Sequence, residues 1–210
     1  MNNETLQNLR LILFFTITFS QFMMGSAIAG ATGPQQMIKE KIDLGMQILK
    51  DPNLQGIDKT IERREKLWSE LQPLFDFNEI AKRALGPHWN TISDDKKGHF
   101  TELFTAVLKN VYLGKSDNYS GENVKFTQEI IQGTRSRVET LFISTKGDAY
   151  KVHFNLHKTK DGWRIYDIII EGVSIISNYR SQFNEILAKS PFEKLVAMLE
   201  EKIVNLEGVY

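Results

Sequence analysis

A change in the spacing of apolar residues limits the folds open to this chain. From Gln35 to Tyr112 apolar residues recur every three or four positions, which predicts helices. After Gly114 they alternate with polar residues, which predicts strands, and after Gly172 the helical spacing returns. A chain with helices, then strands, then helices is expected to form an α+β fold, with helices packed over a twisted antiparallel sheet.

The middle of the chain predicts four strands, over residues 124–131, 135–144, 149–158 and 163–171. The segments Lys146-Gly147-Asp148 and Lys160-Asp161-Gly162 are hairpin signals, so the strands are expected to form a meander. In the third strand, apolar residues share one face and polar residues the other. The apolar face carries Tyr150, Val152, Phe154 and Leu156. The sheet is therefore expected to have one dry side and one wet side.

Helices are expected before the strands, over residues 35–50, 57–71 and 78–85. A long helix follows, with Ser93 as its N-cap and apolar residues at helical spacing from Phe100 to Tyr112. In the second helix, Ile57 and Ile61 belong to the expected apolar face. The charged residues 63–66 are expected to face water.

Two helices are expected after the strands. Gly172 supplies a permissive backbone for the change from strand to helix. The apolar stripe that follows consists of Val173, Ile176, Tyr179, Phe183 and Leu187. The sequence Ser190-Pro191-Phe192-Glu193 is a capping box, which predicts the start of the last helix.

The composition excludes several classes of function. The chain has 26 basic and 26 acidic residues, and no basic cluster is dense enough to predict binding to nucleic acid. Cysteine is absent, so disulfides and thiolate metal sites are excluded. The 210 residues suffice for one domain with a large core, and a monomer is expected.

The N-terminus has the features of a signal peptide over residues 1–29. Arg10 precedes an apolar run, and small residues then give two A-x-A cleavage patterns, which end at Ala29 and Ala31. An uncleaved membrane anchor is the alternative. No later apolar stretch approaches the ~20 residues that span a bilayer, so residues 30–210 are expected to form one soluble, exported domain.

Candidate catalytic and metal-binding groups are sparse. His153 and His157 lie on one face of a strand but about 13 Å apart, too far to share a metal ion, and are expected to be solvated. Ser174 lies between a strand and a helix, yet it lacks the flanking glycines of a nucleophile elbow and is expected to cap the helix. Neither a metal site nor another cofactor is predicted.

Asp167 and Glu171 are the strongest candidates for acid–base chemistry. They share one face of the last predicted strand at a separation of about 13 Å, beyond that of paired glycosidase carboxylates. Hydrogen bonds that anchor the change from strand to helix are the expected role. The chain is therefore predicted not to be an enzyme.

Two blocks of residues resemble one protein family. The first contains Tyr166-Asp167, Glu171-Gly172-Val173-Ser174 and Asn178-Tyr179-Arg180. The second contains Phe75-Asp76-Phe77, Ala81, Leu85-Gly86 and Trp89, followed by the apolar helix that ends in Tyr112. At this spacing they resemble the MlaC-type periplasmic phospholipid-binding proteins, also called the toluene-tolerance family. The resemblance covers about residues 35 to 205.

The resemblance implies a deep apolar cavity between the sheet and the helices. The cavity would hold the acyl chains of a glycerophospholipid and leave the head group at its mouth. The residues expected to line it are Phe104, Leu108, Tyr112, Phe142, Val152, Phe154, Tyr166, Ile168, Ile170, Val173 and Ile176. Arg135, Arg137 and Arg180 are candidates for contact with the phosphate, although an ordinary surface position fits each of them better.

A shuttle in the periplasm that maintains outer-membrane lipid asymmetry is the function implied by the resemblance. Its implied partners are an inner-membrane ABC transporter complex with an MCE-domain ring and an outer-membrane lipoprotein complex. Burial of each methylene contributes ~0.8 kcal/mol, so two chains represent on the order of 25 kcal/mol that the carrier must supply. Binding alone gives no direction to transport.

Three alternatives to a phospholipid carrier are compatible with the sequence. A cone-shaped α+β enzyme would use Asp167 as a base. A carrier of another lipid, such as a hopanoid or an isoprenoid, would have the same apolar pattern. An adaptor protein with a solid core would differ from both in having only water-sized voids.

Overall fold

The computed structural model describes residues 33–117, 119 and 121–207, and the signal peptide expected over residues 1–29 lies outside them. The helices before the strands are α2 (Pro34–Lys50), α3 (Thr60–Leu71), α4 (Phe77–Leu85) and α5 (Asp94–Ser116). The 3₁₀ segments between them are η1 (Pro52–Leu54), η2 (Ile57–Lys59), η3 (Gln72–Leu74) and η4 (Gly86–Thr91). Helices α6 (Ile175–Leu187) and α7 (Phe192–Glu207) follow the strands. The predicted α+β class is confirmed.

The strands form one antiparallel sheet in the order β1-β2-β3-β4-β5. They are β1 (Asn123–Gln132), β2 (Arg135–Ile143), β3 (Ala149–Thr159), β4 (Gly162–Ile170) and β5 (Val173–Ser174). The predicted meander is confirmed for the first four. The fifth strand is an addition, because Glu171 and Gly172 have φ values of 48° and 80° and turn the chain back along β4.

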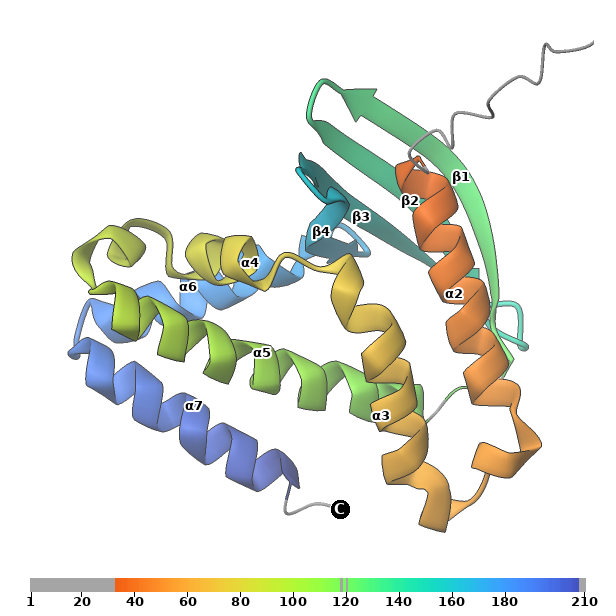
Figure 1. Ribbon diagram of the computed structural model, residues 1–210, viewed down its shortest axis with the longest axis horizontal. Coiled ribbons are helices and arrows are strands. Elements are labelled where there is room, and N and C mark those ends of the chain that lie inside the picture. The colour runs from red at the N-terminus through yellow and green to blue at the C-terminus, as the bar shows by residue number, and fades with distance from the viewer. Residues whose placement is uncertain (1–32, 118, 120, 208–210) are drawn as a thin grey trace, which may run out of the picture. The chain divides into compact units, whose positions relative to one another are not determined.

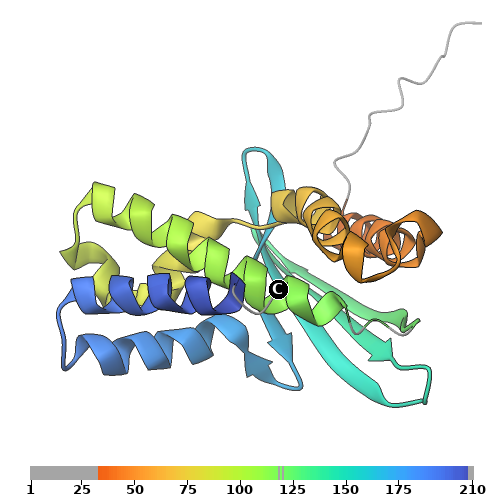
Figure 2. The same ribbon diagram turned by 90° about the horizontal axis from the view of Figure 1, so that it is seen from below.

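Helices cover the sheet in two groups. Figure 1 shows α2 crossing in front of the sheet. The helices α4, α5, α6 and α7 lie together beyond one end of the sheet. In the perpendicular view of Figure 2, α2 and α3 again lie on one side of the sheet. Within these groups α2 packs on α3, α4 on α6, and α5 on α7.

Aromatic rings fill the interior of the group formed by α4 to α7, called here the helical cluster. The ring of Phe104 on α5 lies 4.9 Å from that of Tyr179 and 5.3 Å from that of Phe183, both on α6. Phe100, one turn earlier, lies 5.6 Å from Phe104. All four side chains are buried, so this half of the protein has a close-packed core.

Hydrogen bonds from side chains begin several helices. Ser93 Oγ accepts from the Lys96 N–H at 3.4 Å, and Ser174 Oγ accepts from the Ser177 N–H at 2.9 Å. Both residues are the N-caps that the sequence predicts, of α5 and α6.

The prediction for the faces of α3 is only partly right, because Trp68 and Leu71 face the interior as predicted but Ile61 and Arg63 do not. Ile61 is 68% exposed, whereas Arg63, predicted to face water, is only 8% exposed. The Arg63 guanidinium donates to the Leu54 carbonyl at 2.8 Å and to Asp117 at 3.0 Å. A charged side chain tolerates burial when its donors are satisfied in this way. Apolar spacing therefore predicted the second half of the buried stripe of α3 and failed for its first half.

No helix in residues 33–117 and 121–207 combines the length and the apolar character needed to cross a membrane.

Candidate functional site

A cavity of about 980 Å³ lies between the sheet and the helices α2, α3 and α5. Most of its lining side chains are apolar. Helices α2 and α3 contribute Ile38, Ile42, Met46, Leu49, Leu67, Trp68 and Leu71. On α2 these residues recur every three or four positions, so they form one stripe that faces the sheet.

The opposite wall comes from alternating residues of the sheet. Phe142 on β2 and Val152 and Phe154 on β3 line the cavity. In β4 the apolar lining residues are Ile165, Ile168 and Ile170. The register between β3 and β4 shifts at Asn155/Leu156, where β4 has one residue more than β3. This bulge lets Ile165 and Ile168 share the inner face although three positions separate them.

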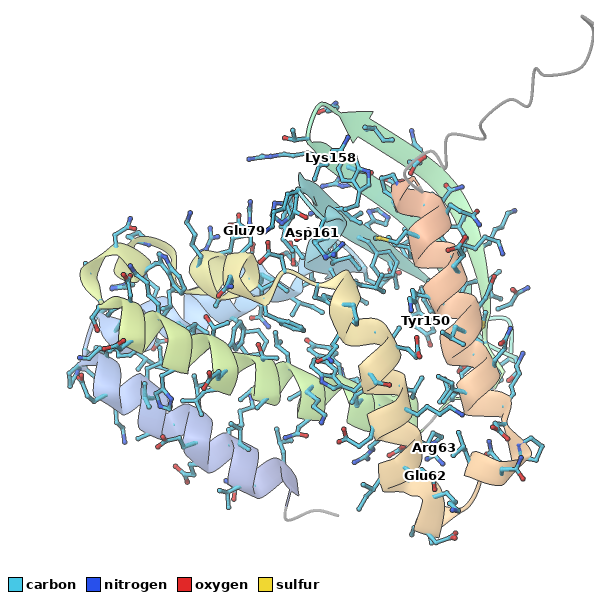
Figure 3. The ribbon with its side chains drawn as sticks, viewed as in Figure 1. Glu62, Arg63, Glu79, Tyr150, Lys158 and Asp161 are labelled. Carbon is cyan, nitrogen blue, oxygen red and sulfur yellow. The ribbon has the colours of Figure 1, made fainter. Side chains whose placement is uncertain are left out.

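The cavity has a closed end and an open end. Ile38, Leu74 and Ile165 are buried at one end, whereas Tyr150 at the other is 49% exposed. Figure 3 shows Tyr150 in the space between α2 and α3. Lys115 is exposed and also lines the cavity. This end is therefore the mouth, where polar groups meet water.

Eight of the predicted site residues line this cavity. They are Leu108, Tyr112, Phe142, Val152, Phe154, Ile168, Ile170 and Ile176. The structure therefore brings together side chains from α5, three strands and α6. Their contact with a lipid stays a prediction.

Three predicted site residues lie outside the lining. Phe104 is buried in the helical cluster, because the face of α5 that carries it is turned toward α6. Tyr166 is the extra residue of the β4 bulge, and its ring lies 3.9 Å from the Arg83 guanidinium and 5.8 Å from the His157 ring. Val173 is 62% exposed, because the turn at Glu171 and Gly172 carries it to the edge of the sheet.

Sequence reasoning missed the residues that α2 and α3 contribute to the cavity. The apolar stripe over residues 35–50 was recognised, but nothing in its spacing distinguishes the wall of a cavity from the face of a solid core. In α3 the predicted apolar residues Trp68 and Leu71 do line the cavity, but Ile57 and Ile61, predicted on the same face, are exposed.

Tyr112 packs against the helical cluster and also lines the cavity. Burial raises its pKa to about 12, and the nearby Tyr179 adds to the rise. Burial also raises the pKa of Tyr179. Both phenols therefore stay neutral to a higher pH than an exposed tyrosine does, in keeping with an apolar environment.

The Asp167 carboxylate lines the cavity and holds the start of α6. Its Oδ2 accepts from the Ser174 hydroxyl at 2.7 Å, and its Oδ1 accepts from the Ile176 N–H at 3.2 Å. Glu171 accepts a hydrogen bond from the Lys151 N–H. The hydrogen bonds of Asp167 and Glu171 therefore anchor the change from strand to helix, as predicted.

The histidine and arginine candidates lie away from the cavity lining. His157 is bonded to the Asp76 carboxylate at 3.0 Å, so its expected solvated state is wrong. In the described part of the chain, no three His, Asp or Glu side chains are grouped so as to hold a metal ion. The Arg137 Nε–H donates to Asn155 at 3.0 Å, and the Arg180 Nε–H donates to the Arg83 carbonyl at 2.5 Å.

A comparison with family models places this geometry in a known family. The model described as MlaC protein matches residues 39–201, which span the helices, the sheet and the cavity. The chain belongs to the MlaC family. The resemblance noted in the sequence is thereby confirmed.

Two individual proteins are similar to this chain over most of its length. The Intermembrane phospholipid transport system binding protein MlaC of Haemophilus influenzae is 22% identical over 214 residues, which cover 96% of this chain and 95% of that protein. A phospholipid-binding protein from Ralstonia solanacearum, solved in complex with a phospholipid, has a TM-score of 0.73 at 22% identity. This match covers 84% of the present chain and 99% of the other, and it shows that the two share a fold.

Proposed function

We propose that this protein is a periplasmic carrier that holds the acyl chains of a glycerophospholipid in the cavity and moves the lipid between the inner and outer membranes. The apolar cavity of about 980 Å³ is the observation that carries the proposal. It lies at the upper end of the range of about 300–1,000 Å³ for ligand pockets, which suits a ligand with two long chains. The MlaC relative from H. influenzae is named for intermembrane phospholipid transport.

Affinity for such a ligand needs no reactive group. Each buried methylene contributes ~0.8 kcal/mol, so the chains supply most of the binding free energy and the head group little. The direction of transport then depends on partners. We propose an inner-membrane ABC transporter complex with an MCE-domain ring and an outer-membrane lipoprotein complex, which together maintain the lipid asymmetry of the outer membrane.

Export to the periplasm is part of the proposal. We expect the signal peptide to be removed near Ala29 or Ala31, so that the mature chain begins at Gly30 or Thr32. N-terminal sequencing of protein released from the periplasm without detergent tests this. A chain that begins at Met1 and stays in a salt-resistant membrane fraction would contradict it.

A carrier releases its lipid unchanged, whereas an enzyme does not. Both oxygens of Asp167 accept hydrogen bonds that start α6, so we expect Asp167→Asn to lower stability by about 1 kcal/mol, as the loss of a helix cap does. The folded variant should still deliver intact diacyl lipid to acceptor vesicles when the partner complex is present.

The transfer assay is read by mass spectrometry of the lipid before and after incubation, with Glu171→Gln as the matched control. Formation of lyso-lipid or of an altered head group by the unmodified protein, abolished by Asp167→Asn, would replace the carrier with an enzyme.

A further inference from the structure

The apolar cavity ends at the same level on α2, β3 and β4. On α2, which crosses the front of the sheet in Figure 1, the lining begins at Ile38. On β3 it ends at Phe154, and on β4 it begins at Ile165. The next buried residues of these strands, Leu156 and Trp163, are absent from the lining in the part of the chain that the structure describes. The cavity therefore stops at this level instead of running through the protein.

Side chains beyond this level are close-packed. Ile38, Val138, Leu156 and Ile165 are at most 1% exposed and belong to one buried cluster, which also contains Leu74. Interiors packed in this way hold few voids larger than a water molecule. Ile38, Leu74 and Ile165 border the cavity at its inner end and are called here the floor.

Two hydrogen bonds hold the elements that carry the floor. The Asp76 N–H donates to the Ile165 carbonyl at 3.0 Å, which fixes the segment after η3 to β4. The Gln35 N–H donates to the Glu129 carboxylate at 2.7 Å, which fixes the start of α2 to β1. The floor is therefore held by hydrogen bonds as well as by packing, and a ligand that pressed against it would have to break both.

The distance from the floor to the mouth matches one layer of lipid chains. Ile38 and Leu49 are the first and last lining residues of α2. The rise of an α-helix places them roughly 16 Å apart along its axis. The hydrocarbon core of a bilayer is about 30 Å thick, so a single layer of chains spans about half of that. The cavity therefore ends about where the acyl chain of a membrane lipid ends.

We propose that the floor sets the longest acyl chain that the cavity accepts, an inference that rests on the proposed function. Burial of one methylene changes an affinity by about fourfold. A lipid drawn from a membrane gains nothing from methylenes that were already buried there, but it loses this factor for each methylene that the cavity cannot take in. The floor therefore selects against chains longer than the cavity is deep.

Vesicles of mixed chain length test the floor directly. Lipid-stripped protein is incubated with vesicles that hold equal amounts of dimyristoleoyl, dipalmitoleoyl, dioleoyl, dieicosenoyl and dierucoyl phosphatidylcholine, in order of increasing length. The protein is separated from the vesicles, and mass spectrometry gives the ratio of bound lipid to vesicle lipid for each length. We expect the ratio to be level for the shorter chains and to fall by about fourfold for each excluded methylene beyond a limit.

Two substitutions at the floor should move this limit in opposite directions. Ile38→Ala deepens the cavity, so the ratio for the first excluded lipid should rise about fourfold or more. Ile38→Phe fills the inner end, so the limit should move to shorter chains, and this variant serves if Ile38→Ala does not fold. Leu49→Ala is the matched control, because it removes as many carbon atoms from the same face of α2 near the mouth. It should lower the total lipid bound and leave the limit unchanged.

The outcomes separate the floor from the carrier role. A wild type that binds every chain length with the same ratio, or floor variants that keep the wild-type limit, would overturn the role of the floor alone. An equal shift in Leu49→Ala would do the same, because the volume of the cavity and not its depth would then set the limit. A wild type that takes up none of these lipids would overturn the proposed function together with this inference.

Discussion

The helical cluster and the cavity are built from the same kinds of side chain but differ in how those side chains meet. In the helical cluster, aromatic rings of α5 and α6 lie within 4.9 to 5.7 Å of one another. Around the cavity, equally apolar residues of α2, α3 and the sheet face about 980 Å³ of space. Apolar composition therefore does not decide whether a region is solid or hollow.

The walls of the cavity are joined along their polar rims. Lys41 on α2 pairs with Glu70 on α3 at 2.9 Å, and Lys109 on α5 pairs with Glu65 on α3 at 2.7 Å. Exposed ion pairs of this kind contribute only about 0–1 kcal/mol each. The cavity walls are therefore held mainly by apolar packing, such as that of Ile38, Val138 and Leu156 in a second buried cluster beside the cavity.

The largest effect is expected from truncating a ring of the helical cluster. Phe104→Ala should lower the free energy of unfolding by about 3–5 kcal/mol, because it leaves a void in a close-packed core. Phe154→Ala in lipid-stripped protein should cost clearly less, because Phe154 already borders an open space. Urea denaturation measures both. Equal losses would mean that the two regions are packed alike.

An enlarged side chain gives the reverse test. Val152→Trp should fold and lose co-purifying phospholipid, because the indole occupies space in the cavity, and Ile168→Trp should behave in the same way. The matched variant is Val107→Trp in the helical cluster, where overpacking should cost about 1–3 kcal/mol or more. A Val152→Trp protein that is destabilised but keeps its full lipid content per folded molecule would contradict the distinction.

The smallest effect concerns the ionisation of Tyr112. An unfolded tyrosine loses its proton near pH 10.0, whereas folded Tyr112 has a pKa of about 12. Its contribution to stability is therefore complete below pH 10.0 and is lost as the pH rises through about 12. A pH titration of tyrosinate absorbance should show a phenol that ionises near pH 12 in the wild type and is absent from Tyr112→Phe. Lipid should delay its ionisation further and leave Tyr179 unchanged, since Tyr179 is absent from the described cavity lining.

The sequence predicts the fold well because the four long strands and most helices have a recognisable local pattern. The alternation in β3, the hairpin glycines and the caps Ser93 and Ser174 all agree with the structure. Departures occur where tertiary contacts override the pattern. Arg63 is buried because its guanidinium donates hydrogen bonds to the Asp117 carboxylate and the Leu54 carbonyl. The first acceptor is distant in the sequence and the second belongs to the backbone, so local apolar spacing predicts neither bond.

The candidate site was predicted less completely, for reasons of geometry. A bulge at Tyr166 reverses which residues of β4 face inward, and the sequence gives no clear sign of its position. The sequence predicts Tyr166, Ile168 and Ile170 on one inner face, whereas the structure turns Tyr166 away from the cavity. Whether a cavity exists at all depends on the distance between helices and sheet, which apolar spacing does not encode.

Mass spectrometry of an organic extract tests the carrier most directly. The full 210-residue chain is expressed, purified from a periplasmic extract without detergent, and extracted with organic solvent alongside Val152→Trp as a matched control. We predict intact diacyl glycerophospholipid at about one molecule per cavity in the wild type, in keeping with a pocket of this size, and much less in the variant. A folded wild-type protein that yields no lipid, or the same amount as Val152→Trp, would contradict a lipid-filled cavity.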